Sequence, residues 1–187
     1  MKTMILACAL ASGLPMAARA QAADMAAIAA QQAAMAKLAP MRGIWRGPAV
    51  SKTPQGEIRM TQTERVGTFL DGTLTLVEGK AFLEDGKTGF HAFGAISYDA
   101  ATQSYWMSSH AQGRSGRFQL AVTDNGWSWD IPAGPAKIHY VAGFADGKWT
   151  ETGDYVAPGQ PPRRIFEMTL SRIGDTDWPE AGGVTKR

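Results

Sequence analysis

Hydrophobic and polar positions follow a β pattern from Ile44 to Ile173. Short runs rich in β-branched and aromatic residues alternate there with turn signals, and no segment after residue 40 has a helical period. Asp-Gly or Asn-Gly pairs stand at 71–72, 85–86, 125–126 and 146–147. Such pairs favour β-hairpin turns, because Asn and Asp tolerate positive φ and Gly adopts it without steric cost. The pattern predicts about ten strands, near 44–51, 57–66, 73–80, 89–97, 104–112, 116–123, 127–131, 136–144, 148–156 and 164–173.

Consecutive strands of this kind usually pair with each other, and closing the sheet removes exposed edges that would invite aggregation. The predicted fold class is therefore all-β: a closed antiparallel up-and-down β-barrel of about ten strands with a short N-terminal helix. The helix is expected over Asp24–Leu38, with Asp24 as its N-cap and Pro40 ending it. Residues 25, 28, 32, 35 and 38 fall at helical spacing, so one side of it would be apolar. It is either a packed leader or a lid or membrane-surface helix.

The first residues resemble an export signal. Lys2 gives a positive start, an apolar run follows, and Ala-x-Ala sites end at Ala20 and Ala22. The apolar run is shorter than the ~20 residues that a membrane span requires. We therefore expect a periplasmic or secreted protein whose mature chain begins at Gln21 or Ala23. The predicted segments are a signal peptide (1–22), a helical leader (23–42), a barrel (43–174) and a C-terminal tail (175–187).

Removing the signal peptide changes the charge and the cysteine count. The full chain has 19 Lys and Arg against 17 Asp and Glu, and loss of Lys2 and Arg19 leaves 17 against 17. A neutral chain has no long-range field for a polyanion, so we expect no nucleic-acid partner. The single cysteine, Cys8, is also lost, so the mature protein must depend on its core rather than on disulfides.

Several segments resemble a known family. The motif Gly43-Ile44-Trp45, after a short helix, is similar to the opening of lipocalin-like (calycin) barrels. The segments 35–47 (MAKLAPMRGIWRG), 70–79 (LDGTLTLVEG), 93–99 (FGAISYD) and 166–174 (FEMTLSRIG) resemble a bacterial family of uncharacterised lipocalin-like proteins, the DUF1579 type. The resemblance implies a β-barrel in which Trp45 closes one end of the core. It implies no established activity and no catalytic residue.

Side chains alternate between the two faces of a strand, so polar residues on the more apolar face are candidates for the barrel interior. Glu64, Glu78 and Glu151 are predicted there, and His110 shares its face with Trp106. The candidate ligand-binding residues are Gln62, Glu64, Glu78, Trp106, His110, Tyr140, Glu151 and Tyr155. Alternatively, the acids lie at the barrel rims, in water or paired with arginines at 65, 114 or 117.

The sequence contains no convincing metal or cofactor motif. His91, His110 and His139 fall on three different predicted strands without zinc-site spacing. Haem barrels of the nitrobindin kind are similar in outline, but their axial ligand is a His late in the chain, and residues 163–173 contain none. No metal and no cofactor are therefore predicted.

Three functions remain open. The chain is an exported binder of a small, partly apolar ligand, or a small barrel enzyme that uses an inward Glu with His110. The third possibility is a filled barrel that binds another protein. Cavity volume separates them, because ligand pockets occupy about 300–1,000 Å³.

Overall fold

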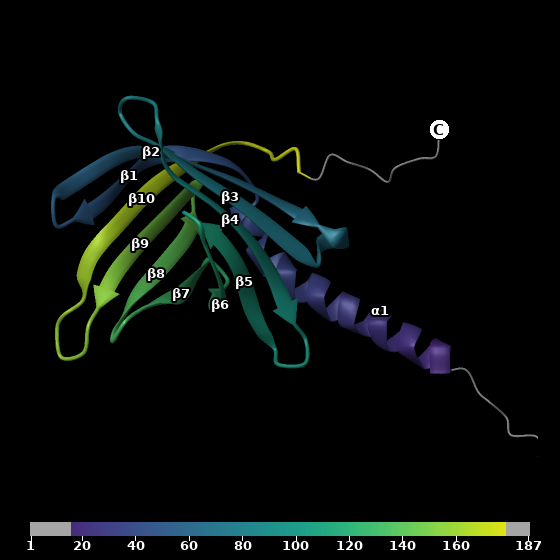
Figure 1. Ribbon diagram of the computed structural model, residues 1–187. Helices are drawn as coiled ribbons and strands as arrows, with labels where there is room; N and C mark the ends of the chain where they lie inside the picture. Colours follow the sequence, from purple (N-terminus) through teal and green to yellow (C-terminus); the bar gives the residue numbers. More distant parts are fainter. Residues whose placement is uncertain (1–15, 179–187) are drawn as a thin grey trace, which may run out of the picture.

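The computed structural model describes residues 16–178, with side chains described from Met25 onward. Ten antiparallel strands form one closed barrel in which each strand pairs with its sequence neighbours and β1 pairs with β10 (Figure 1). The strands are β1 (Gly43–Thr53), β2 (Gly56–Phe69), β3 (Leu74–Phe82), β4 (Thr88–Asp99), β5 (Ser104–Ala111), β6 (Arg114–Thr123), β7 (Gly126–Ala133), β8 (Ala136–Ala145), β9 (Lys148–Val156) and β10 (Arg163–Gly174). The predicted fold class is confirmed.

Three of the four hairpins predicted from Asp-Gly and Asn-Gly pairs have the expected positive φ, whereas the turn before Gly126 reverses without it at Asn125 or Gly126. Asp71, Gly72, Gly86, Asp146 and Gly147 all have positive φ. The first of these turns also contains a short 3-10 helix, η2 (Leu70–Gly72), between β2 and β3. Turn chemistry that is encoded in the sequence therefore sets where the meander reverses.

The N-terminal helix differs from the prediction. Helix α1 spans Met16–Met35, so it begins eight residues before Asp24, which lies within the helix rather than at its N-cap. A 3-10 helix, η1 (Ala36–Met41), follows and contains Pro40. The Ala-rich sequence extends the helix toward the N-terminus, because Ala has the highest helix propensity, whereas the α-helix ends at Met35, before the predicted Leu38. Pro40 ends the α-helical geometry but is tolerated in the tighter turn.

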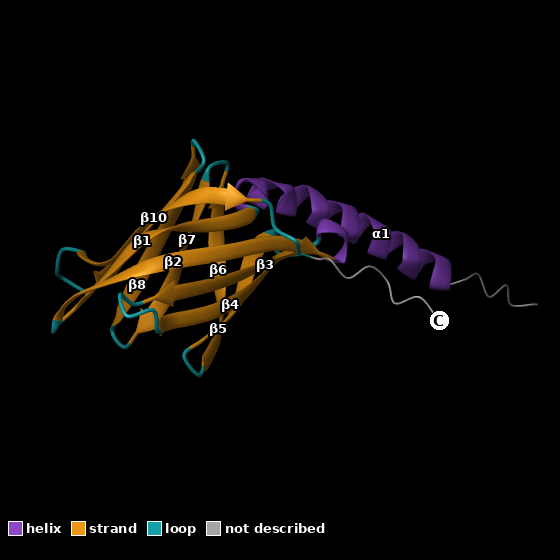
Figure 2. Ribbon diagram, turned by 90° about the horizontal axis from the view of Figure 1, so that it is seen from above, coloured by secondary structure: helices purple, strands orange, loops and turns teal. Residues whose placement is uncertain are grey.

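Only the C-terminal part of this helical segment packs against the barrel. Met25 is 57% exposed, whereas Met35, Leu38 and Met41 are buried. Tyr105 donates a hydrogen bond from its hydroxyl to the Ala34 carbonyl oxygen, at 2.8 Å. The rest of α1 extends beyond the end of the barrel (Figure 2). The predicted apolar side of the helix is therefore used only over its last turn and η1, which cover one end of the barrel.

An aromatic core lies beneath that helical cover. Trp45 is 2% exposed and its indole Nε1 donates to the Met41 carbonyl oxygen at 2.8 Å. Its ring lies 5.9 Å from the ring of Trp149 and 6.2 Å from that of Phe144, centroid to centroid. Trp45 thus occupies the structural position that the family resemblance implied. Among the described residues, none of the three helical segments has the length and apolar character that crossing a membrane requires.

Candidate functional site

The barrel encloses a cavity of about 970 Å³. It extends from Met41, beneath the helical cover, to the hairpins at the opposite end of the barrel, where Ser51, Leu83 and Gln112 line it. Most of its wall is apolar and is supplied by inward-facing residues of the strands, among them Met60, Ile96, Met107, Phe118, Trp129 and Phe166. The volume is at the upper end of the range for ligand pockets, about 300–1,000 Å³.

Glu64 lies in this wall on β2. The residue is 8% exposed, and the Gln62 amide donates a hydrogen bond from Nε2 to Glu64 Oε1 at 2.6 Å. The carboxyl group lies over Gly79 of β3, where a Cβ atom would stand only 2.8 Å from Oε1. Gly79 therefore provides the space that the carboxyl group occupies, and Gln62 fixes its orientation.

Glu151 enters the same cavity from β9. It is also 8% exposed, and its register partners are Ala142 on β8 and Met168 on β10. Neither partner can neutralise or hydrogen-bond a carboxyl group through its side chain. Within the described part of the chain, Glu151 makes no side-chain hydrogen bond or ion pair. Its carboxyl group is therefore available to a molecule in the cavity.

A glycine also shapes the wall beside Glu151. A Cβ atom at Gly153 would lie 2.7 Å from the ring of Tyr140, so the ring covers this glycine. Tyr140 in turn stacks on Trp129 with ring centroids 5.3 Å apart. The predicted inward position of Glu151, between Trp149 and Gly153 on one strand face, is confirmed.

Burial changes the protonation of both acids. Burial raises the pKa of Glu64 from 4.5 to about 8. The hydrogen bond from Gln62 lowers this pKa in part, and repulsion from Glu78 raises it further. Burial also raises the pKa of Glu151 from 4.5 to about 8, and repulsion from Glu64 contributes. The nearby indole N–H of Trp149 offsets part of that rise, although its geometry falls short of a hydrogen bond.

A third titratable group reports on the same environment. Burial raises the pKa of Tyr140 to about 12, and the negative charge of Glu151 adds to the rise. At neutral pH the site therefore holds two carboxyl groups that are mainly protonated, together with a neutral phenol. Such a site can donate or accept hydrogen bonds, and it can release protons when a cation approaches.

Four of the eight predicted site residues line the cavity together, and four do not. Those that line it are Gln62, Glu64, Tyr140 and Glu151. The alternative interpretation, with the acids at solvated rims or paired with arginines, is wrong for both Glu64 and Glu151. Tyr155 follows Glu151 and Gly153 on the same strand face but does not line the cavity. Its ring is instead in contact with Arg163, whose guanidinium carbon lies 5.5 Å from the ring centroid.

The inward assignment of Glu78 is wrong. The buried residues of β3 are Thr75, Gly79 and Ala81, so this set forms its inner face and Glu78 lies on the outer face. Its Oε1 atom is 3.0 Å from Nε2 of His91 on β4. Sequence alternation failed here because the inner face of β3 carries small residues while leucines lie outside.

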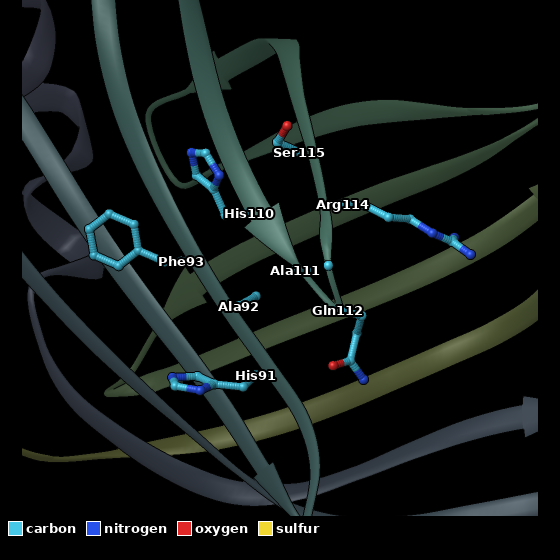
Figure 3. A pocket seen from close by; sticks show the side chains of 9 residues that line it. His91, Ala92, Phe93, His110, Ala111, Gln112, Arg114 and Ser115 are labelled. Atoms are coloured by element: carbon cyan, nitrogen blue, oxygen red, sulfur yellow. The ribbon is translucent and has the colours of Figure 1, made fainter.

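The inward assignment of Trp106 and His110 is also wrong, because the inner face of β5 carries Met107 and Ser109. The guanidinium carbon of Arg117 lies 4.2 Å from the Trp106 ring centroid. His110 instead lines a smaller outer pocket of about 450 Å³ with His91 and Phe93. Figure 3 shows Gln112 and Arg114 directed away from these histidines. The structure therefore does not bring His110 and an inward Glu together.

The described residues contain no group of three or more His, Cys, Asp or Glu side chains that could hold a metal ion. His139 makes a local contact, with its Nδ1 atom 2.7 Å from Oδ1 of Asp130. His91 and His110 lie on the paired strands β4 and β5 beside the outer pocket, and His139 lies apart from them on β8.

Most of the aromatic wall around Tyr140 is absent from the predicted site residues. Trp127 and Trp129 both line it from β7, and Phe118 lies against Trp129 with ring centroids 5.0 Å apart. The pattern Trp127-Ser128-Trp129 places two indoles on one strand face, which is the signal that could have revealed them. The role of Gly79 has no such signal, because it depends on the side chain of a neighbouring strand.

Comparison with known proteins supports the fold alone. No protein-family model matches the chain, and no curated protein matches it. Among solved structures, the chain is similar to the crystal structure of Rv2717c from M. tuberculosis. The TM-score is 0.57 at 13% identity, and the match covers 75% of this chain and 97% of that one. At this identity the two proteins share a barrel architecture, and function has to be argued from the site itself.

Proposed function

We propose that this protein binds a small, partly apolar molecule inside its barrel. The observation that carries the proposal is the cavity of about 970 Å³, whose apolar wall contains a small number of convergent polar groups. Ligand sites typically combine an apolar lining with a few polar groups that orient the ligand. Here those groups are Gln62, Glu64, Tyr140 and Glu151.

The geometry favours binding over the two alternatives. A barrel that acts only as a protein-interaction module needs no interior space, whereas this interior remains open. An enzyme using an inward Glu with His110 needs the two side chains within hydrogen-bond reach. His110 lies in the outer pocket, so that pair is not formed.

Binding can be tested by filling the cavity. Ser109 lines it from β5 and lies in register with Gly94 and Gly116, so a large side chain at this position would extend into the cavity. We expect Ser109→Trp to weaken binding of the neutral apolar dye N-phenyl-1-naphthylamine at least tenfold. The matched control is Ser108→Trp, whose side chain lies on the exposed outer face of the same strand.

The dye titration should be saturable with one site per chain, and circular dichroism should show that both variants keep the wild-type β signal. Absence of saturable binding to the wild type, or equal affinities of the two tryptophan variants, would contradict the proposal. Native mass spectrometry of protein purified from its natural source would then identify the molecule that the cavity carries.

We also propose that the protein is exported and that it is a member of the DUF1579 type. Export is supported by the sequence features of residues 1–22, whose first fifteen residues lie outside the described part of the chain. The family assignment is supported by the four sequence segments and by the buried Trp45 at the start of β1. An exported location would give the cavity access to molecules that enter from the cell exterior.

A further inference from the structure

We propose that the cavity takes an amphipathic organic cation, with its ammonium group between Glu64 and Glu151 and its apolar part against the aromatic wall. This inference rests on the proposed binding function and specifies the chemical class of the ligand. It follows from the charge distribution of the cavity, the unused hydrogen-bonding capacity of Glu151, and the aromatic rings beside it.

The charged groups of the cavity are distributed unevenly. Among the described residues that line it, the titratable or charged ones are Glu64, Glu151, Tyr140, Arg114 and Arg117. Arg114 begins β6 at the open end, next to the hairpin turn, and its side chain is exposed. The Arg117 guanidinium lies over the Trp106 ring, on the outer face. The inner part of the cavity therefore has two acids and no basic side chain.

Neither acid forms an ion pair within the described chain. Glu64 accepts one hydrogen bond, from the neutral amide of Gln62. Glu151 is at least nine-tenths buried, lines the cavity and has no side-chain partner among the residues described. Buried acids are normally either paired or protonated, so a cation between these two would supply the partner that their ionised forms lack.

The aromatic wall favours an organic cation over a small inorganic one. Phe118, Trp129, Tyr140 and Phe166 form a continuous row, with successive ring centroids 5.0, 5.3 and 6.1 Å apart. All four rings line the cavity. Aromatic faces attract ammonium groups electrostatically and bury attached apolar chains, which is how quaternary ammonium ligands are commonly recognised. A hard metal ion would instead require several more oxygen ligands.

Proton release follows from this arrangement. The carboxyl groups are mainly protonated in the empty cavity at neutral pH, because burial raises the pKa of each to about 8. A bound cation stabilises the carboxylate forms, so binding must displace protons into solvent. Affinity for a permanently charged cation therefore rises with pH between 6 and 8.

The test compares two probes that differ at the polar end. Decyltrimethylammonium carries a permanent positive charge, and 1-decanol presents a neutral hydroxyl on the same alkyl chain. Isothermal titration calorimetry at pH 6 and pH 8, in buffers of different ionisation enthalpy, measures both affinity and proton release. The variants are Glu64→Gln/Glu151→Gln and, as the matched control, Glu84→Gln at the exposed hairpin between β3 and β4.

We expect the wild type to bind the cation at least tenfold more tightly at pH 8 than at pH 6, with proton release. The double variant should lose at least tenfold in affinity for the cation while binding 1-decanol like the wild type. Glu84→Gln should match the wild type with both probes. Equal binding of the cation by the wild type and the double variant would overturn the inference. Tight binding of 1-decanol without preference for the cation would also overturn it while leaving the proposed binding function intact. Binding of neither probe, together with a negative dye titration, would contradict both.

Discussion

The pH dependence of stability tests whether Glu151 is a buried, unpaired carboxyl group. Replacement by Gln keeps the size and planar shape of the side chain and removes its ionisation. Because burial raises the pKa of Glu151 from 4.5 to about 8, the folded protein retains a proton that the unfolded chain releases. The stability of the wild type must therefore decrease as pH rises from about 4.5 to about 8. The variant lacks this contribution.

The magnitude follows from the size of the pKa shift. One pKa unit corresponds to about 1.4 kcal/mol, so a shift from 4.5 to about 8 is equivalent to about 5 kcal/mol when the group is fully ionised. At pH 7 the same relation gives about 3 kcal/mol, and at pH 5 about 1 kcal/mol. We therefore expect Glu151→Gln to be close to the wild type at pH 5 and more stable by up to about 3 kcal/mol at pH 7.

Urea unfolding followed by tryptophan fluorescence, in steps from pH 5 to pH 8.5, measures this difference. Glu64→Gln should behave similarly, because its amide oxygen can still accept the hydrogen bond that the Gln62 amide donates. Glu84→Gln is the control and should follow the wild-type curve, because Glu84 is exposed in the hairpin between β3 and β4. Superposition of the Glu151→Gln and wild-type curves would show that Glu151 is solvated. A variant that is less stable at pH 8 would show that a cation inside the protein pairs with it.

Three further predictions concern the core, the site and the N-terminus. Trp45→Ala should lower the free energy of unfolding by about 3–5 kcal/mol in urea, because it removes a large aromatic side chain from a core. A loss below about 1 kcal/mol would mean that Trp45 does not support the barrel end. Gly79→Ala should displace the Glu64 carboxyl group and abolish cation binding, as measured by calorimetry. The control, Gly143→Ala, should be tolerated, because a Cβ atom there would stand 3.4 Å from its nearest neighbour. Exported protein should begin at Gln21 or Ala23 by N-terminal sequencing, and material beginning at Met1 would refute the signal-peptide prediction.

The barrel could be predicted because its determinants are local. Hairpin turns need particular residues, and strands need alternation, so each reversal of the chain is visible in sequence. The predicted limits of β9, Lys148–Val156, match the structure. The helix was harder to delimit, because alanines on both sides of Asp24 are equally good helix formers and give no boundary signal.

The site could be predicted only where burial follows hydrophobicity. Glu64 and Glu151 alternate with apolar residues of their own inner faces, so their positions were correct. Glu78 alternates with Leu74 and Leu76, but in β3 these leucines lie on the outside. The reason lies in neighbouring strands, because the small inner residue Gly79 is required by the carboxyl group of Glu64. A packing requirement between strands cannot be read from the periodicity of a single strand.

The two inward acids are difficult to explain by structure alone. Each costs stability at neutral pH, and neither joins two strands through an ion pair in the described chain, so an apolar residue of similar size would serve the barrel better. Structural carboxylates usually show a lowered pKa through hydrogen bonds to the charged form, as Asp99 does on the barrel surface. Glu64 and Glu151 show the opposite shift, inside a cavity that has room for a molecule. Groups held in an unfavourable state next to an open space are typical of functional sites, because the ligand supplies the compensation that the protein lacks.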